Sequence, residues 1–341
     1  MPRHDYDGDN MVYEYWKSRL PTQLQRAYEL ALAGFQGLNA NVDCGAISLD
    51  DCKRVYYAIY NDHAELYYLS SAMSCTQFRA GPFDRGRCMI KAEFLFTNRD
   101  IVRRNTEMER ICESLRRRMP AGSDEKKERM LCDYLIENAR YEIDNRYNQN
   151  AGTLLVDHKG QCSGISKAFK YLCDQMNIQC IYVTGDLEDR SDHSREAHAW
   201  NIVRVDGRFY HVDVTSMLSA NKSRRKPYHY VDYNFSDTKI NADHFWDWST
   251  TPRCNDIFTD NSDPSVRRLP AVSAMFQLRG HLMRMDMKGK FKIVFDCNIR
   301  MEADKLLQQI LDLVVSILKQ RHISKSISIN MVGPEVTITL S

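Results

Sequence analysis

The sequence predicts an α+β fold on three observations. Amphipathic helical spacing recurs through most of residues 12–146. A further helical stretch at residues 162–176 is followed by a β-hairpin pattern, in which two alternating strand-like runs flank Asp206-Gly207. A strand, a long apolar helix and two more strands fill residues 290–340, which we expect to form a small α+β unit.

The first 146 residues are expected to be mainly helical. The run Ser-Leu-Asp-Asp at residues 48–51 is a typical helix start. One segment, residues 90–97, favours a strand or a connecting segment. The expected helices are residues 12–35, 49–60, 63–72 (a short helix or turn), 99–118 and 123–146.

Strand patterns become common after residue 180. The expected strands of the central part are residues 180–184, 198–205 and 208–215, followed by aromatic-rich segments at 228–235 and 244–248. The polar stretch at residues 259–268 predicts a linker. The last part predicts a strand at 290–297, a helix at 302–320 that packs on its own sheet, and strands at 325–330 and 335–340 around a Gly-Pro turn.

Length and charge limit the classes of protein that the chain can belong to. Its 341 residues predict two or three lobes, which we place at residues 1–104, 105–257 and 268–341. The net charge of +2 argues against a nucleic-acid partner. The basic cluster at residues 222–226 is read as a solvated loop or, alternatively, as a contact for an acidic partner.

The composition favours a cytoplasmic protein without a membrane partner. No segment reaches the roughly 18–20 uncharged apolar residues that span a bilayer, and the N-terminal residues contain no apolar signal core. The 11 cysteines are odd in number and scattered, so we expect no disulfide framework. They include no C-x-x-C pair, so we expect no structural zinc, and we predict no other metal and no cofactor.

Cys162 is the candidate nucleophile because it lies in the first turn of an expected helix. The dipole and the unpaired amides of a helix start favour a negative charge there. We expect Gly160 to supply a positive φ before the helix and Gly164 to allow close approach of another backbone. Cys173 shares the apolar stripe and is interpreted as structural. The stripe consists of Ile165, Phe169, Leu172 and Met176.

The hairpin at residues 198–215 supplies two candidate partners for Cys162. A two-residue turn at Asp206-Gly207 places Val205 opposite Arg208, Val203 opposite Tyr210 and Trp200 opposite Asp213. His198 and Asp213 then form a diagonal pair on one face, about 7–8 Å apart at Cβ. A carboxylate bonded to one imidazole nitrogen fixes the tautomer and leaves the other nitrogen for the thiol.

Three other histidines are weaker candidates for the base. His211 shares a face with Asp213 but lies opposite Ile202, farther from the end of the strand that carries His198. His193 lies in an acidic loop, where a fixed geometry is hard to maintain. His158 precedes the cysteine turn and is interpreted as a polar surface residue. The order Cys162, His198, Asp213 is the arrangement that nucleophilic catalysis requires.

The sequence resembles the transglutaminase-like superfamily of cysteine acyl-transfer enzymes, which has a papain-like fold, and looks like a bacterial-type member. The resemblance covers about residues 105–257 and rests on GQCSGISKAFKYL at 160–172 and HAWNIVRVDGRFYHVDVT at 198–215. Two weaker segments support it, at residues 128–144 and 243–255. It departs from relatives at Ile165, where an aromatic residue is common.

The resemblance implies a helix that carries the nucleophile and packs on an antiparallel sheet. It implies Cys162 as the nucleophile, His198 as general base and acid, and Asp213 as the orienting carboxylate. The expected reaction is acyl transfer through a thioester, with a protein or peptide as substrate. Trp200 and the aromatic group Phe245, Trp246 and Trp248 are candidates for the walls of the cleft, or for ordinary core packing.

Three hypotheses about function remain open from the sequence. The first is a cytoplasmic cysteine peptidase or amidase, favoured by the complete triad. The second is a protein-glutamine transglutaminase, which ranks lower because no acidic loop has calcium-ligand spacing. The third is a non-catalytic transglutaminase-like interaction module, suggested by the large flanking regions. The sequence does not define the substrate or the oligomeric state.

Overall fold

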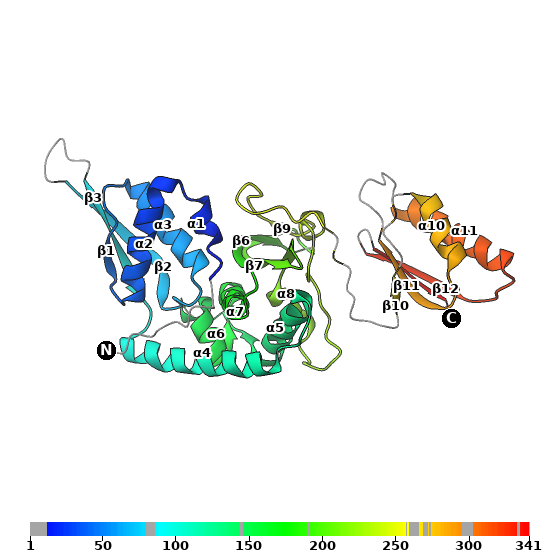
Figure 1. Ribbon diagram of the computed structural model, residues 1–341, viewed down its shortest axis with the longest axis horizontal. Helices are drawn as coiled ribbons and strands as arrows, with labels where there is room; N and C mark the ends of the chain where they lie inside the picture. The colour runs from blue at the N-terminus through cyan, green and yellow to red at the C-terminus, as the bar shows by residue number, and fades with distance from the viewer. Residues whose placement is uncertain are drawn as a thin grey trace. The chain divides into compact units, whose positions relative to one another are not determined.

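The computed structural model describes residues 12–79, 86–143, 146–189, 191–256, 258, 266–268, 272, 274–294, 303–332 and 335–340. The chain divides into two compact units, Met1–Asp256 and Ile257–Ser341. Both units contain helices and strands (Figure 1), so the fold class is α+β, as the sequence predicts. The predicted further boundary near residue 104 stays a prediction.

The first part of unit 1 is a group of helices packed on a small sheet (Figure 1). Its elements are α1 (Tyr15–Arg19), α2 (Thr22–Gln36), β1 (Asn41–Asp43), α3 (Leu49–Asp62), β2 (Leu69–Phe78) and β3 (Arg87–Phe94). The sheet has the order β1-β3-β2. The side chain of Ser48 accepts a hydrogen bond from the Asp51 amide, which confirms the predicted start of α3.

The structure adds this three-stranded sheet to the helices predicted for the N-terminal region. Residues 69–72, expected as part of a short helix or turn, begin strand β2. Pairing between β2 and β3 decides the outcome, because strand formation depends more on partners than on local preference. The segment at 90–97, predicted as a strand or a connecting segment, is both: residues 90–94 belong to β3, and residues 95–97 connect β3 to α4.

Helices and two short strands connect this part to the central sheet. They are α4 (Asn98–Arg118), α5 (Asp124–Asn138), β4 (Arg140–Tyr141), the 3₁₀ helix η1 (Arg146–Gln149), α6 (Ala151–Asp157) and β5 (Lys159–Gly160). The helix predicted at 123–146 therefore ends earlier, at Asn138. The helix does not continue because Ala139 is extended and residues 140–141 pair with β5 as parallel strands.

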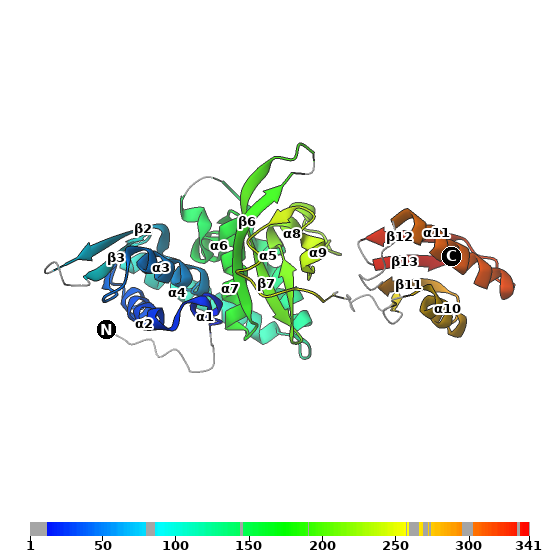
Figure 2. The ribbon, with the colours of Figure 1, turned by 90° about the horizontal axis from the view of Figure 1, so that it is seen from above.

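The central sheet carries helix α7 (Cys162–Gln175) on one face (Figure 2). Its strands are β6 (Cys180–Glu188), β7 (Arg195–Val205), β8 (Arg208–Val212) and β9 (His244–Phe245), in the order β8-β7-β6-β9 with antiparallel neighbours. Two buried hydrogen bonds fasten α7 to β7: Ser166 Oγ donates to the Ala199 carbonyl (2.8 Å), and Asn201 Nδ2 donates to the Ser166 carbonyl (3.0 Å). The predicted packing of this helix on an antiparallel sheet is confirmed.

The β7–β8 hairpin has the predicted register. Asp206 and Gly207 both have positive φ, at 48° and 86°, and Val205 pairs with Arg208 and Val203 with Tyr210. The predicted strand at 208–215 is too long, however, because β8 ends at Val212. Asp213 instead caps helix α8 (Val214–Ala220), since its side chain accepts a hydrogen bond from the Thr215 amide. The short helix α9 (Asp237–Ile240) follows.

Unit 2 is a helical pair on a four-stranded sheet with the order β10-β11-β13-β12. Its elements are β10 (Val266–Arg268), α10 (Met275–Arg284), β11 (Gly289–Val294), α11 (Ala303–Gln320), β12 (Ile327–Val332) and β13 (Glu335–Leu340). Apolar residues of α11 share one buried core with the sheet, which confirms that this helix packs on its own sheet. The predicted linker residues 259–265, strand residues 295–297, helix residue 302 and the turn at 333–334 lie outside the described residues.

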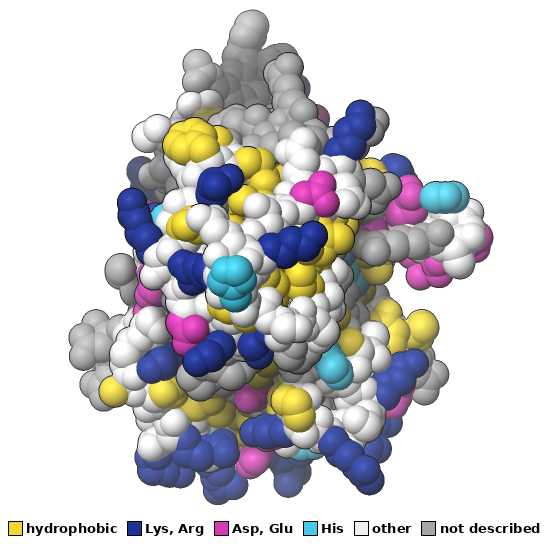
Figure 3. Space-filling model, turned by 90° about the vertical axis from the view of Figure 1, so that its right-hand side faces the viewer, with side chains coloured by type: hydrophobic (Ala, Val, Ile, Leu, Met, Phe, Trp, Pro, Cys, Tyr) yellow, Lys and Arg dark blue, Asp and Glu magenta, His cyan; other side chains and the backbone are white. Residues whose placement is uncertain are grey.

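None of the helices in the described part of the chain is long and apolar enough to cross a membrane. On the face drawn in Figure 3, Lys and Arg side chains are spread out among hydrophobic and acidic ones. The cytoplasmic location and the absence of a nucleic-acid partner stay predictions.

Candidate active site

Cys162 is the first residue of α7 and is half-buried. The backbone before it is held by the 3₁₀ segment, because the Gln161 amide donates to the Asn148 carbonyl (2.8 Å). The same carbonyl would collide with any side chain at Gly164, so the predicted close approach at this glycine is confirmed. Cys173, predicted to be structural, is fully buried.

The expected positive φ at Gly160 is wrong. The left-handed residue of this turn is His158, at φ 60°, and it ends helix α6. Gly160 has another reason for lacking a side chain: a Cβ there would lie 2.7 Å from the Leu154 side chain. The residues before α7 are therefore tightly packed and do not form a flexible turn.

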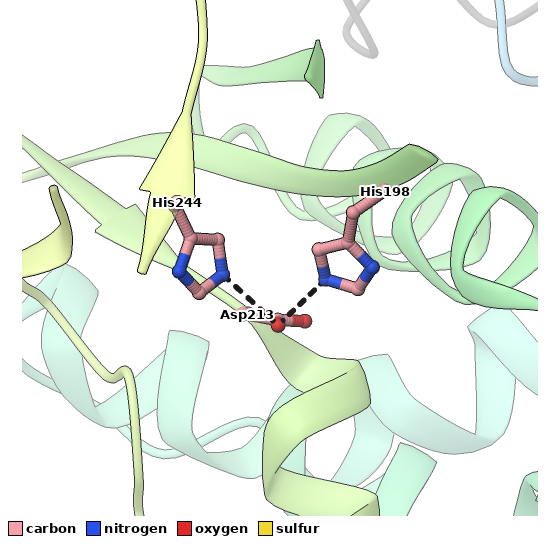
Figure 4. Close-up of side chains that lie close together, drawn as sticks. All are labelled: His198, Asp213 and His244. Atoms are coloured by element: carbon pink, nitrogen blue, oxygen red, sulfur yellow. Dashed lines mark hydrogen bonds and ion pairs between the residues drawn. The ribbon is translucent and has the colours of Figure 1, made fainter. Parts of the chain in front are cut away.

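His198 and Asp213 lie together at the end of the hairpin farthest from its turn. His198 Nε2 is 2.9 Å from Asp213 Oδ2, and both side chains are buried (Figure 4). This contact uses Nε2 of the imidazole, so Nδ1 remains for Cys162. The structure thus brings together the two hairpin residues that the register predicts.

Asp213 divides its two carboxylate oxygens between the fold and the histidines. Oδ1 accepts the amide hydrogen of Thr215 at 2.8 Å and caps α8. Oδ2 accepts the Ser216 hydroxyl at 2.7 Å in addition to His198. Burial alone would raise the pKa of Asp213, but hydrogen bonds from His198 and His244 hold this pKa far below its usual range. Asp213 is therefore a carboxylate at any physiological pH.

The His198 imidazole is stabilised in its protonated form. Burial lowers its pKa, but hydrogen bonds with Asp213 and Cys162 together with their negative charges outweigh burial and raise the pKa to about 10. The Cys162 side chain is one of the groups that raise this pKa, which places it near the ring. The charged, proton-donating form of His198 is therefore the one that these contacts favour at neutral pH.

His244, on strand β9, is a member of the site that sequence reasoning missed. Its Nε2 is 3.4 Å from Asp213 Oδ2, and its Nδ1 is 2.7 Å from Asp243 Oδ1 (Figure 4). Because an ionised carboxylate only accepts hydrogen bonds, these two contacts favour a proton on both ring nitrogens of His244. The pKa of His244 is raised accordingly, because its bonds to Asp213 and Asp243 outweigh burial.

Sequence reasoning recognised the segment of His244 as aromatic and as similar to relatives, but assigned no role to the histidine. The signal that could have identified it is the pair Asp243-His244 just before Phe245 and Trp246, in a stretch noted for its resemblance to relatives. Strand β9 pairs with β6, and this long-range pairing is what brings His244 to Asp213.

His211 hydrogen-bonds to residues other than Cys162 and Asp213. Its Nδ1 accepts from the Trp200 indole (3.0 Å), so its Nε2 donates to Asp237 Oδ1 (3.0 Å). Burial lowers the pKa of His211, which agrees with a neutral ring. The Trp200 ring stacks on His198 with 6.0 Å between centroids. Trp200 is fully buried and therefore belongs to the core behind the site rather than to a solvent-lined wall.

The remaining histidine candidates contact residues other than Asp213. The exposed His193 lies in the loop between β6 and β7 and hydrogen-bonds to Glu188, the last residue of β6. His158 is the left-handed residue that ends α6. Within the described part of the chain, neither residue forms a hydrogen bond or an ion pair with His198 or Asp213.

Two groups of side chains have the atoms and spacing that could hold a metal ion: His198–Asp213–His244 and His211–Asp237–Cys254, each within 4.8 Å. Hydrogen bonds already engage the imidazole and carboxylate atoms of both groups. Asp237 Oδ1 also accepts from the Cys254 amide at 3.2 Å. Hydrogen bonding accounts for both groups, and we derive no chemistry from a metal.

Fold and site together define a class of α+β protein in which a cysteine at a helix start lies beside a His–Asp pair on an antiparallel sheet. Residues 113–214 match the family described as the transglutaminase-like superfamily. The segment includes Cys162, His198 and Asp213. No curated protein matches the chain.

Solved structures show weaker similarity. A candidate cysteine protease from Cytophaga hutchinsonii is 13% identical, with a TM-score of 0.28 over 42% of this chain and 62% of that one. A protein described as a TGase is 12% identical, with a TM-score of 0.31 over 51% and 58%. The periplasmic domain of TgpA from Pseudomonas aeruginosa is 14% identical, with a TM-score of 0.27 over 45% and 68%. This chain thus spans less than two thirds of the first two proteins.

Proposed function

We propose that the protein is a thiol-dependent acyl-transfer enzyme, a cysteine peptidase or amidase that cleaves peptide or isopeptide amides. Cys162 is the nucleophile, His198 the general base and acid, and Asp213 the residue that orients His198. The observation that carries the proposal is the buried 2.9 Å contact between His198 Nε2 and Asp213 Oδ2, which leaves Nδ1 for the thiol.

The chemistry follows from the protonation states at the site. The Cys162 sulfur attacks the carbonyl carbon of the amide, and the new C–S bond gives a tetrahedral oxyanion. The C–N bond then breaks as the His198 imidazolium gives its proton to the leaving amine, which yields a thioester. Neutral His198 next removes a proton from water, the resulting hydroxide attacks the thioester, and Cys162 is released as a thiolate beside protonated His198.

The helix start supplies one stabilising group for the oxyanion. The first amides of a helix have no partner within the helix, so the Cys162 N–H is available to donate. This N–H lies next to the Cys162 side chain, so it can donate a hydrogen bond to the oxygen of the carbonyl that the sulfur attacks. Asp213 contributes by holding the imidazole, because it remains ionised and fixes which nitrogen faces the thiol.

Alkylation by iodoacetamide near pH 6.5 tests the proposal. A free thiol is only a few per cent thiolate near neutral pH, so a persistent thiolate should react about 30-fold faster. The reference is the free thiol N-acetylcysteine in the same solution, because burial raises the pKa of Cys75, a second half-buried cysteine, to about 12 and slows its reaction in any case. We expect Cys162 to react far faster than this free thiol, and His198→Ala to remove that advantage. A Cys162 rate no higher than that of the free thiol would refute the proposal and favour a non-catalytic interaction module.

Two further comparisons make the assignment specific. Asp213→Ala should slow the labelling of Cys162 much more than His211→Ala, because His211 bonds to Trp200 and Asp237 instead. The opposite ranking would contradict the assigned triad. With the native enzyme, release of new amino termini from a peptide library indicates hydrolysis, whereas incorporation of an amine probe would indicate a transglutaminase.

A further inference from the structure

A cavity of about 230 Å³ lies between the end of α5, strand β4 and helix α8. Its apolar lining comes from Ile136, Ala139 and Leu218, and its charged lining from Arg140, Lys222 and Arg224. We call these six residues and the space between them the basic pocket. Three cations and no carboxylate line it.

The basic pocket adjoins the candidate active site through Tyr141, which also lines it. Tyr141 pairs with Gly160, two residues before Cys162, and neighbouring strands are about 4.8 Å apart. Burial raises the pKa of the Tyr141 phenol, and the nearby Cys162, Glu196 and Asp213 raise it further. Helix α8, on the other side of the cavity, begins directly after Asp213.

The three cations of the basic pocket keep their positive charge available to a ligand, because no carboxylate of a described residue pairs with them. The Arg224 guanidinium donates to the carbonyls of Glu137 (3.1 Å) and Ala139 (2.6 Å), which fixes it without cancelling its charge. No carboxylate of a described residue forms an ion pair with Arg140 or Lys222. The nearby carboxylate of Glu137 is engaged by Lys226 (3.2 Å) and the Tyr228 hydroxyl (3.0 Å).

We propose that the basic pocket is a substrate subsite that binds a carboxylate of the peptide next to the reacting amide, so that the preferred substrates are acidic peptides. The inference rests on the proposed function, since it places the carboxylate relative to an amide at Cys162. Guanidinium and ammonium groups on an apolar floor suit an acid with a short aliphatic stem. Part of the basic cluster at residues 222–226 thereby acquires a role.

Binding to the full-length Cys162→Ala protein tests the subsite without turnover. The probes are fluorescent alanine-based peptides in which one Glu, or the isosteric Gln, is moved along the chain. Peptides with an amidated C-terminus separate a side-chain carboxylate from a terminal one. We expect at least one Glu position to bind about fivefold or more tightly than its Gln counterpart at low salt, with a smaller difference at high salt.

Matched variants locate the preference. Arg140→Gln combined with Lys222→Gln should abolish the difference between Glu and Gln peptides, whereas Arg225→Gln, on the same loop but outside the pocket, should preserve it. Equal binding of Glu and Gln peptides at all positions would overturn the inference. A preference for Glu that is unchanged in the double variant would also overturn it. The alkylation rate of Cys162 without peptide judges the proposed function separately.

Discussion

Asp213 shows at the scale of a single residue how this fold and its proposed chemistry share atoms. Oδ1 caps α8 through the Thr215 amide, while Oδ2 receives His198, Ser216 and, at 3.4 Å, His244. Removing the whole side chain therefore removes a helix cap and an orienting carboxylate at once. A cap of this type is worth about 0.5–2 kcal/mol of stability.

Asp213→Asn should separate the two roles, because asparagine is also a good helix cap but carries no negative charge. Without that charge, His198 loses the partner that holds its proton on Nε2. We expect Cys162 alkylation near pH 6.5 to slow by up to about 30-fold, the full advantage of a persistent thiolate, with a melting temperature within a few degrees of the native protein. Rate and melting temperature are measured on the same preparation.

Ser216→Ala is the control for Asp213→Asn, since it removes only one donor from the same oxygen. Its alkylation rate should stay within a few-fold of the native value. An Asn variant that labels as fast as the native protein would contradict the orienting role of Asp213.

The three proposed site residues could be predicted because their signals are local. Cys162 begins a helix, and a two-residue turn fixes the separation of His198 from Asp213. His244 could not be predicted in this way. It is 31 residues from Asp213 and reaches it only because the two-residue strand β9 pairs with β6.

At the scale of elements, a buried glutamate joins α5 to the segment after α8. Glu128 Oε2 accepts the Tyr233 hydroxyl (3.0 Å) and the Asn234 amide (2.8 Å). Its other oxygen, Oε1, has no hydrogen-bond partner among the described residues. Burial therefore dominates and raises the pKa of Glu128 to about 8, so the protonated acid is favoured in the folded protein.

This raised pKa predicts a pH dependence of stability. The folded value of about 8 exceeds the unfolded value of 4.5, so the contribution of Glu128 is fully present below about pH 4.5 and is lost as pH rises through 8. The difference amounts to at most about 5 kcal/mol. Glu128→Gln resembles the protonated acid, and its melting temperature should fall less than that of the native protein between pH 6 and pH 9.

Glu109→Gln, an exposed change on α4, is the control for this pH series and should follow the native curve. Parallel curves for Glu128→Gln and the native protein would show that Glu128 is ionised in the fold at neutral pH.

Elements whose ends are marked by local residues could be predicted from the sequence. Strands that form only by pairing with segments elsewhere in the chain could not. Ser48 marks the start of α3, and the Asp206-Gly207 turn sets the hairpin. Strand β2 and the β4–β5 pair lack such signals and form because partners elsewhere in the chain complete their ladders. The early end of α5 has the same cause.

At the scale of the whole molecule, two compact units divide the chain near residue 256. Unit 2 has its own core, in which residues such as Phe291, Ile310 and Ile338 are fully buried. All proposed site residues and the basic pocket belong to unit 1. An independent core is the physical requirement for independent folding.

A chain ending at Asp256 should therefore fold and retain the reactivity of Cys162. We expect its alkylation rate near pH 6.5 to lie within about twofold of the full chain, because all residues proposed for the site belong to unit 1. The separate unit 2 should give its own cooperative thermal transition. A truncated protein that aggregates or loses the Cys162 advantage would show that the units depend on each other.

The short hairpin also has a consequence for how such chains can vary in length. His198 and Asp213 stay on one face only if the 15-residue interval between them is kept, because one added residue would turn one strand over relative to the other. The interval from Cys162 to His198 contains the exposed loop between β6 and β7, which can lengthen without moving either residue. Insertions and deletions in the evolution of this architecture should therefore accumulate between the cysteine and the histidine, and be rare between the histidine and the aspartate.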